Sequence, residues 1–174
     1  MIRPMMTLAV ALVPLPVLAQ SPCLPLGAQV ALCAEGTPWA EARALPLDDD
    51  FVSYEAPPLY LEASTSWITP GEAGTPEAAL SALEAALAED TAAEGAPLPL
   101  RRGRETVTTD HATITYDVFI EVDAGEAFPL AVMVLEDQGG WLTLMLSSDT
   151  PMEEDRFMAE ADSLARLLRP APEG

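Results

Sequence analysis

The sequence predicts an α+β domain: an antiparallel sheet with a three-strand meander, flanked by two amphipathic helices as an α/β/α sandwich. Three observations support this fold class. Residues 112–148 contain three apolar or alternating segments typical of strands, short turns separate them, and a Thr-Pro pair precedes each of two helical apolar patterns. The 174 residues suffice for one core after removal of an export signal.

The first 19 residues have the features of a cleavable signal peptide. Arg3 supplies positive charge, residues 8–18 are apolar, and Ala19 ends a small-residue cleavage site. The apolar stretch is too short for a spanning helix, which disfavours an uncleaved anchor. A lipoprotein is disfavoured because the first cysteine, Cys23, does not lie at the cleavage point. We therefore expect a periplasmic protein, cleaved after Ala19.

The only two cysteines, Cys23 and Cys33, predict a structural disulfide, because the compartment is oxidising and the pair is close in sequence. A redox-active pair is the alternative, but the C-x-x-C spacing is missing. Two cysteines without nearby histidines also make a poor zinc site. We expect residues 20–46 to form an extension pinned by this disulfide, with Trp39 against the main body. Residues 47–170 then form a single domain, followed by a tail at 171–174.

The charge of the chain excludes several partners. Eight basic residues, all of them arginine, face 28 acidic ones, for a net charge of -20. Such a surface repels nucleic acids and anionic membranes, whereas a basic partner or a cation is easier to accommodate. The run Asp48-Asp49-Asp50 lacks the glycine and the distal glutamate of a calcium loop. We interpret it as a solvated acidic loop, with a cation site as the alternative.

Residues 51–69 predict one or two strands interrupted by Pro57-Pro58. Four of the ten aromatic residues gather here, between Phe51 and Trp67. We expect them to form core or sheet edge, and a ligand pocket is the alternative. A helix then begins at Thr75, with Pro76 in its first position. Its predicted buried stripe contains Leu80, Leu83 and Leu87 with Ala79, Ala82 and Ala86.

Arg101, Arg102 and Arg104 form the only basic cluster of the chain. The cluster is a candidate site for an acidic partner or a carboxylate ligand. The simpler interpretation, which we prefer, is that it neutralises nearby acidic side chains at a strand edge or in a loop.

The predicted meander comprises residues 112–122, 130–135 and 141–148. In its first strand the even positions are apolar, and the odd positions are polar except for Phe119. Thr150 to Glu153 resembles a capping box with Pro151 in the first helical position. The helix that follows should bury one stripe and end at the prolines at 170 and 172. The predicted stripe consists of Phe157, Ala161, Leu164 and Leu168.

His111 is the only histidine, so a catalytic triad would have to use it as the base. The alternation places it on the odd, more polar face of its strand, together with Phe119. The chain lacks a G-x-S-x-G elbow, nucleotide-binding glycine motifs and a recognisable set of metal ligands. We therefore predict no catalytic residue, no metal and no cofactor. The candidate binding surfaces are the three arginines and the face with His111 and Phe119.

The order of elements resembles the PsbP-like α/β/α sandwich family over residues 51–168. The resemblance rests on the aromatic strands with prolines, the Thr-Pro helix start, the meander and the segment SSDTPMEEDRFMAEADSLARLL. It implies an accessory or binding module without catalysis, and no family site residue can be assigned in this chain.

Together these features predict an exported, non-enzymatic accessory or protein-binding module of the bacterial cell envelope, whose partner is an envelope or periplasmic protein. A periplasmic small-ligand or cation-binding domain is the alternative, and a hydrolase that uses His111 ranks third. The sequence leaves the oligomeric state open.

Overall fold

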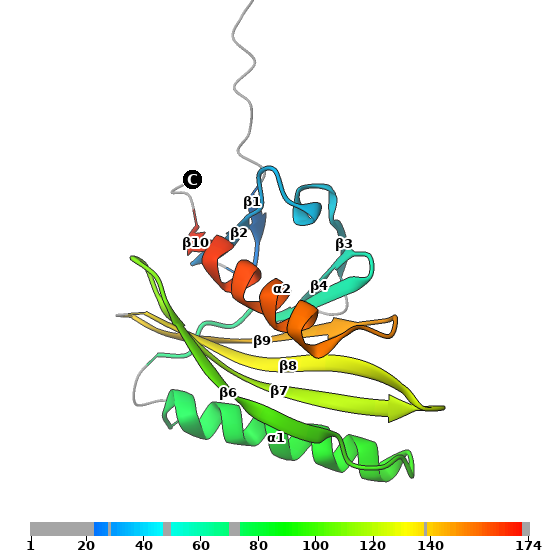
Figure 1. The fold of residues 1–174 in the computed structure, drawn as a ribbon. Coiled ribbons are helices and arrows are strands. Elements are labelled where there is room, and N and C mark those ends of the chain that lie inside the picture. Colours follow the sequence, from blue (N-terminus) through cyan, green and yellow to red (C-terminus); the bar gives the residue numbers. More distant parts are fainter. Residues whose placement is uncertain (1–22, 28, 47–49, 70–73, 138, 172–174) are drawn as a thin grey trace, which may run out of the picture.

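The computed structural model describes residues 23–27, 29–46, 50–69, 74–137 and 139–171 (Figure 1). The predicted signal peptide and the residues Asp48 and Asp49 of the predicted acidic loop lie outside these ranges. Among the described helices, none is long and apolar enough to cross a membrane.

The described strands form two antiparallel sheets, which confirms the predicted α+β class. The larger sheet has the order β3-β4-β5-β9-β8-β7-β6. Its strands are β3 (Arg43–Pro46), β4 (Phe51–Ala56), β5 (Leu59–Ser64), β6 (Leu100–Thr108), β7 (Thr113–Asp123), β8 (Glu126–Asp137) and β9 (Gly140–Ser148). The smaller sheet has the order β1-β2-β10, with β1 (Cys23–Pro25), β2 (Val30–Cys33) and β10 (Leu168–Pro170).

The helices cover opposite faces of the larger sheet (Figure 1). α1 (Pro76–Ala93) lies on one face, and α2 (Glu154–Leu167) lies with the smaller sheet on the other; a 3-10 helix, η1 (Pro38–Glu41), precedes β3. The larger core, on the α2 side, contains Tyr116, Leu32 and Phe157, all fully buried. A smaller core lies beneath α1 and contains Leu80, Phe119, Leu130, Val132, Val134 and Trp141.

The predicted meander is confirmed as β7, β8 and β9. Asp123 pairs with Glu126 across a two-residue turn, and Ala124 and Gly125 both have positive φ, as tight hairpin turns require. Asp117 lies on the predicted polar face of β7 and is nevertheless fully buried. The reason is that α1 covers this face. Both faces of β7 are therefore partly buried, and the alternation of apolar and polar residues does not tell which side chains face solvent.

The start of α1 matches the prediction, because the Thr75 hydroxyl accepts a hydrogen bond from the Ala78 N–H at 3.3 Å. The buried stripe is narrower than predicted. Leu80 is fully buried, Leu83 and Leu87 are half-buried, and both Ala82 and Ala86 are exposed. The helix packs mainly on β8 and less on β9. The residues on the two sides of its buried stripe are therefore only partly covered by the sheet.

The predicted capping box at the start of α2 is wrong. The helix begins at Glu154, and its N-cap residue Glu153 makes no side-chain capping bond. The Thr150 carbonyl instead accepts a hydrogen bond from the Ser148 hydroxyl, and the Met152 N–H donates to Ala127 O at 3.1 Å. These bonds, with burial of the Met152 side chain, anchor the preceding segment to the sheet in place of the predicted first helical turn.

The apolar stripe of α2 is confirmed at Phe157, Ala161 and Leu164, which are fully buried. The helix ends at Leu167, earlier than predicted. Leu168 is buried as predicted but belongs to β10, where it pairs with Leu32 of β2.

The N-terminal segment is joined to this core. The predicted disulfide between Cys23 and Cys33 is present and links β1 to β2. Trp39 is 3 % exposed and packs in the larger core, as predicted. The Tyr54 hydroxyl donates a hydrogen bond to Pro25 O at 2.6 Å, which ties β4 to this segment.

Candidate functional site

The three predicted arginines lie on β6, an edge strand of the larger sheet. The register of β6 with β7 shifts between Arg101 and Gly103, which marks a bulge. Residues three apart in a regular strand point to opposite faces, but the extra residue brings Arg101 and Arg104 to the same face. Arg102 forms an ion pair elsewhere, with Glu154 of α2 at 3.2 Å.

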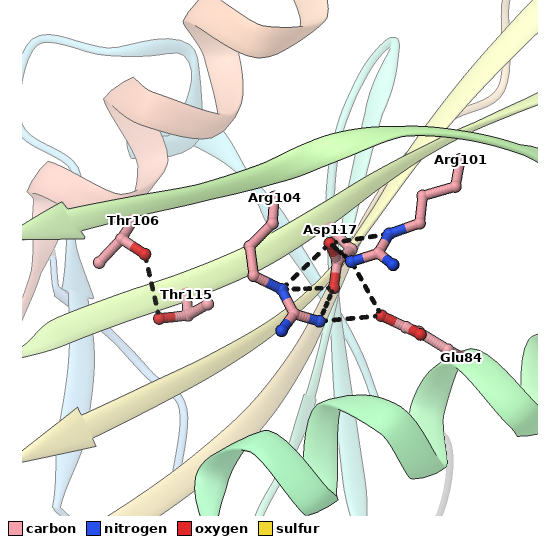
Figure 2. Close-up of polar contacts among 6 residues, drawn as sticks. All are labelled: Glu84, Arg101, Arg104, Thr106, Thr115 and Asp117. Carbon is pink, nitrogen blue, oxygen red and sulfur yellow. Dashed lines mark hydrogen bonds and ion pairs between the residues drawn. The ribbon is translucent and has the colours of Figure 1, made fainter.

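Arg101 and Arg104 converge on the buried carboxylate of Asp117 (Figure 2). Their Nη2 atoms lie 2.6 Å from Asp117 Oδ1 and Oδ2, respectively, and both Nε atoms also donate to Asp117. Glu84 of α1 completes the group, because Arg104 Nη2 donates to Glu84 Oε1 at 3.2 Å. The four side chains therefore join β6, β7 and α1.

The pKa values of the two carboxyl groups in this network are shifted in opposite directions. Burial by itself would raise the pKa of Asp117, but hydrogen bonds from Arg104, Glu84 and Arg101 hold that pKa below its usual value. The pKa of Glu84 is raised, first by its hydrogen bond to Asp117 and then by burial and the charge of Asp117. Asp117 is thus the charged partner of the arginines, and Glu84 is the carboxyl more readily protonated.

This geometry matches the interpretation in which the basic cluster neutralises nearby acids. The side chains of Arg101, Arg102 and Arg104 remain 39–46 % exposed, yet each is paired within the chain. Their role in binding a partner stays a prediction.

The predicted shared face of His111 and Phe119 is wrong. β7 begins at Thr113, and His111 is an exposed residue of the preceding turn, where its N–H donates to the Thr109 hydroxyl at 3.2 Å. Phe119 is 7 % exposed and packs beneath α1. The local turn around Thr109 ends the alternation from which we predicted the position of His111.

The aromatic residues of β4 and β5 do not form one pocket. Tyr54 is buried in the larger core. The hydroxyl of Tyr60 donates to Glu55 Oε1 at 3.0 Å and to Asp149 Oδ2 at 3.4 Å. Phe51 is 38 % exposed. Tyr54 agrees with the expectation of a core position, whereas β4 and β5 have neighbours on both sides and are not edges of the sheet.

A surface cleft lies between α1 and the strands β4, β5, β8 and β9, with a volume of about 200 Å³. Leu83, Ala86, Leu87 and Asp90 line it from the helix. The strands contribute Phe51, Glu62, Ser64, Val132, Thr143, Leu144 and Met145. The cleft forms because α1 follows β8 and leaves part of the neighbouring strands uncovered. We take it as the candidate binding site.

A second depression, of about 260 Å³, flanks α1 on the side of β6 and is more polar. It is lined by Pro76, Glu77, Leu80, Arg104, Thr106, Thr113, Thr115, Val134 and Glu136. The hydroxyls of Thr106 and Thr115 lie 3.4 Å apart there (Figure 2). Within the described ranges, no group of three or more His, Cys, Asp or Glu side chains could hold a metal ion.

No family model matches this chain, and no curated protein matches it. Among solved structures, it is similar to the crystal structure of LpqN, which is involved in cell envelope biogenesis of Mycobacterium tuberculosis. The TM-score is 0.43 at 16 % identity, over 84 % of this chain and 86 % of LpqN. A similarity at this level assigns neither a family nor a function, and the PsbP-like resemblance stays a prediction.

Proposed function

We propose that the chain is an exported, non-enzymatic protein-binding module of the bacterial cell envelope and that the cleft beside α1 is its docking site. The size of the cleft carries this proposal. Small-molecule sites usually enclose roughly 300–1,000 Å³. The cleft measures about 200 Å³ and opens to the surface, which suits one side chain of a partner better than a whole metabolite.

The surface around the cleft supports the same function. Phe51 and Ala86 are exposed next to the half-buried Leu83 and Leu87, so apolar side chains of a strand and a helix meet at the surface. Contiguous exposed apolar patches of this kind often mark interaction sites. The Cys23–Cys33 disulfide supports an oxidising compartment outside the cytoplasm.

A matched pair of helix variants tests the proposal. Ala86 lines the cleft, whereas Ala85 is exposed on α1 and is not among the cleft residues. Ala86→Gln should fill the cleft with a polar side chain, and Ala85→Gln should leave it open. Glutamine is a good helix former, so both variants should keep the fold and similar melting temperatures.

The measurement is capture of cross-linked partners from the cell envelope by the tagged mature chain, quantified by mass spectrometry. We expect wild type and Ala85→Gln to capture the same partner in equal amounts. Ala86→Gln should capture at least about tenfold less of it, which corresponds to about 1.4 kcal/mol of binding free energy. Equal capture by all three chains, or capture by none, would contradict docking in the cleft. In the second case a thermal-shift screen would test the small-ligand alternative.

A further inference from the structure

We propose that the cleft accepts an arginine or lysine side chain from a cationic segment of the partner. This inference rests on the proposed function and specifies the chemistry of its partner. The apolar lining would contact the methylene stem of the basic side chain, and the carboxylate of Asp90 would meet its charged head.

The charge of α1 gives the first argument. The helix contains no basic residue, and its last turns carry Glu89 and Asp90, followed by Glu94 at the C-cap. The C-terminal end of a helix is the negative end of its dipole, where each acidic side chain costs about 0.3–1 kcal/mol instead of stabilising the helix. Helix stability therefore does not account for this arrangement, whereas attraction of a cation does.

Glu94, at the C-cap of α1, also acts on a carboxyl group of the sheet. The pKa of Glu121 is raised by its burial and by the negative charge of Glu94. A positive charge brought to this end of α1 would relieve such repulsion.

The composition of the cleft gives the second argument. Two carboxylates, Asp90 from α1 and Glu62 from β5, border a lining that is mostly apolar, and none of the described lining residues is basic. A leucine or phenylalanine anchor would use the apolar lining but would remove water from the exposed Asp90 carboxylate without replacing its hydrogen bonds, which costs free energy. An arginine or lysine anchor satisfies both parts of the site.

The remaining charges of the chain favour the same partner. The net charge is -20, and Arg43, Arg101, Arg102 and Arg104 are each already paired with an acidic side chain. The field of the whole molecule therefore steers cationic segments toward its surface.

The test uses two synthetic pentapeptides, acetyl-Gly-Ser-Arg-Ser-Gly-amide and the same peptide with citrulline in place of arginine. Citrulline preserves the shape of arginine without the charge, so the pair isolates the ionic contact. Each peptide is titrated into the isotope-labelled mature chain, and binding is followed by the NMR signals of the methyl groups of Met145 and Leu87, both of which line the cleft. We expect the arginine peptide to bind at least about tenfold more tightly than the citrulline peptide.

Two variants locate the contact. Asp90→Asn and Glu89→Gln each remove one negative charge from adjacent positions of α1, but only Asp90 lines the cleft. Both changes should affect the helix equally, so a severalfold loss of arginine-peptide affinity should appear only in Asp90→Asn. Equal losses in both variants would indicate long-range attraction and would overturn the specific contact.

The remaining outcomes separate this inference from the proposed function. If the citrulline peptide binds equally well, the charged anchor is wrong, while docking in the cleft stands. Binding that leaves the Met145 and Leu87 signals unchanged, or no binding of either peptide, also overturns the inference. The proposed function itself fails only in the capture experiment with Ala86→Gln.

Discussion

Asp117 joins side chains of β6 and α1 to the central sheet. Its side chain is 0 % exposed, and its charge is balanced by hydrogen bonds from two guanidinium groups. Removing one partner from a buried ionic group usually costs more than the intact group contributes, because the remaining charges lose their balance.

We expect Asp117→Asn to destabilise the chain by about 2–3 kcal/mol, since it removes charged hydrogen bonds to Arg101 and Arg104. The loss stays at this level because both arginines are partly exposed and can turn toward water. Asp123→Asn, at the exposed end of β7, should change stability by less than about 0.5 kcal/mol. Urea unfolding of the two variants measures the difference, and equal midpoints would show that the network contributes little.

Ionisation of Glu84 makes the stability of the fold depend on pH, at pH values above those at which Asp117 is protonated. Its folded pKa is raised above the ordinary value of 4.5, so its contribution to stability is complete below pH 4.5 and is lost as the pH rises through the folded pKa. The pKa of Asp117 is lowered from 3.8, so its contribution is lost only as the pH falls below that value.

We therefore expect Glu84→Gln to gain stability relative to wild type between pH 4.5 and pH 7, because glutamine removes this unfavourable ionisation. Glu77, in the first turn of the same helix, provides a control that titrates in a lower pH range. Its pKa is lowered from 4.5, first by its own backbone hydrogen bond and then by Thr75, so its contribution to stability is already present above pH 4.5, and Glu77→Gln should show little further change relative to wild type between pH 4.5 and pH 7. Urea unfolding at both pH values tests the pair, and parallel trends in the two variants would refute the assignment.

At the scale of secondary structure, sequence patterns predicted those elements whose residues are arranged by local rules. Alternation at Ile114 and Tyr116 identified β7, and Thr75-Pro76 identified the start of α1. Long-range contacts decided the cases that failed. Met152 bonds to the sheet in place of the predicted first turn of α2, and Leu168 pairs with β2 instead of continuing the helix.

The arrangement of the arginines shows why site geometry is harder to predict than strands. Nothing in Arg101-Arg102-Gly103-Arg104 fixes a bulge, although the glycine permits one. In a regular strand, Arg101 and Arg104 would point to opposite faces. The sequence pattern alone therefore did not predict that both contact Asp117. The ion pairs agree with the preferred neutralisation of nearby acids, and one of these acids, Asp117, is fully buried.

The cleft was not predictable because it depends on where α1 lies on the sheet. The helical period places Ala86 on the same stripe as Leu83 and Leu87, and we therefore expected it to be buried. Since the helix follows β8, that side of the stripe faces an opening instead. The one sequence signal was the size of the residue: alanine at this position leaves room that a leucine would fill.

At the scale of the whole molecule, the excess of negative charge opposes compact folding. With 28 acidic and eight basic residues, the folded chain brings many carboxylates close together and repels itself. The unfolded chain spreads the same charges farther apart. Mobile ions screen this repulsion over a Debye length of about 10 Å at 0.1 M salt and about 3 Å at 1 M. The buried pairs around Asp117 are screened much less, because ions do not enter the core.

Sodium chloride should therefore stabilise the mature chain at pH 7. If screening of this repulsion raises the free energy of unfolding by about 1 kcal/mol, the melting temperature should rise by roughly 2–4 °C between 10 mM and 500 mM salt. At about pH 4, where many carboxylates are protonated, the same addition should have little effect or the opposite sign. Thermal unfolding followed by circular dichroism at the two pH values measures both responses. A melting temperature that falls with salt at pH 7 would mean that surface ion pairs, such as Arg43–Glu55 and Arg102–Glu154, outweigh the self-repulsion.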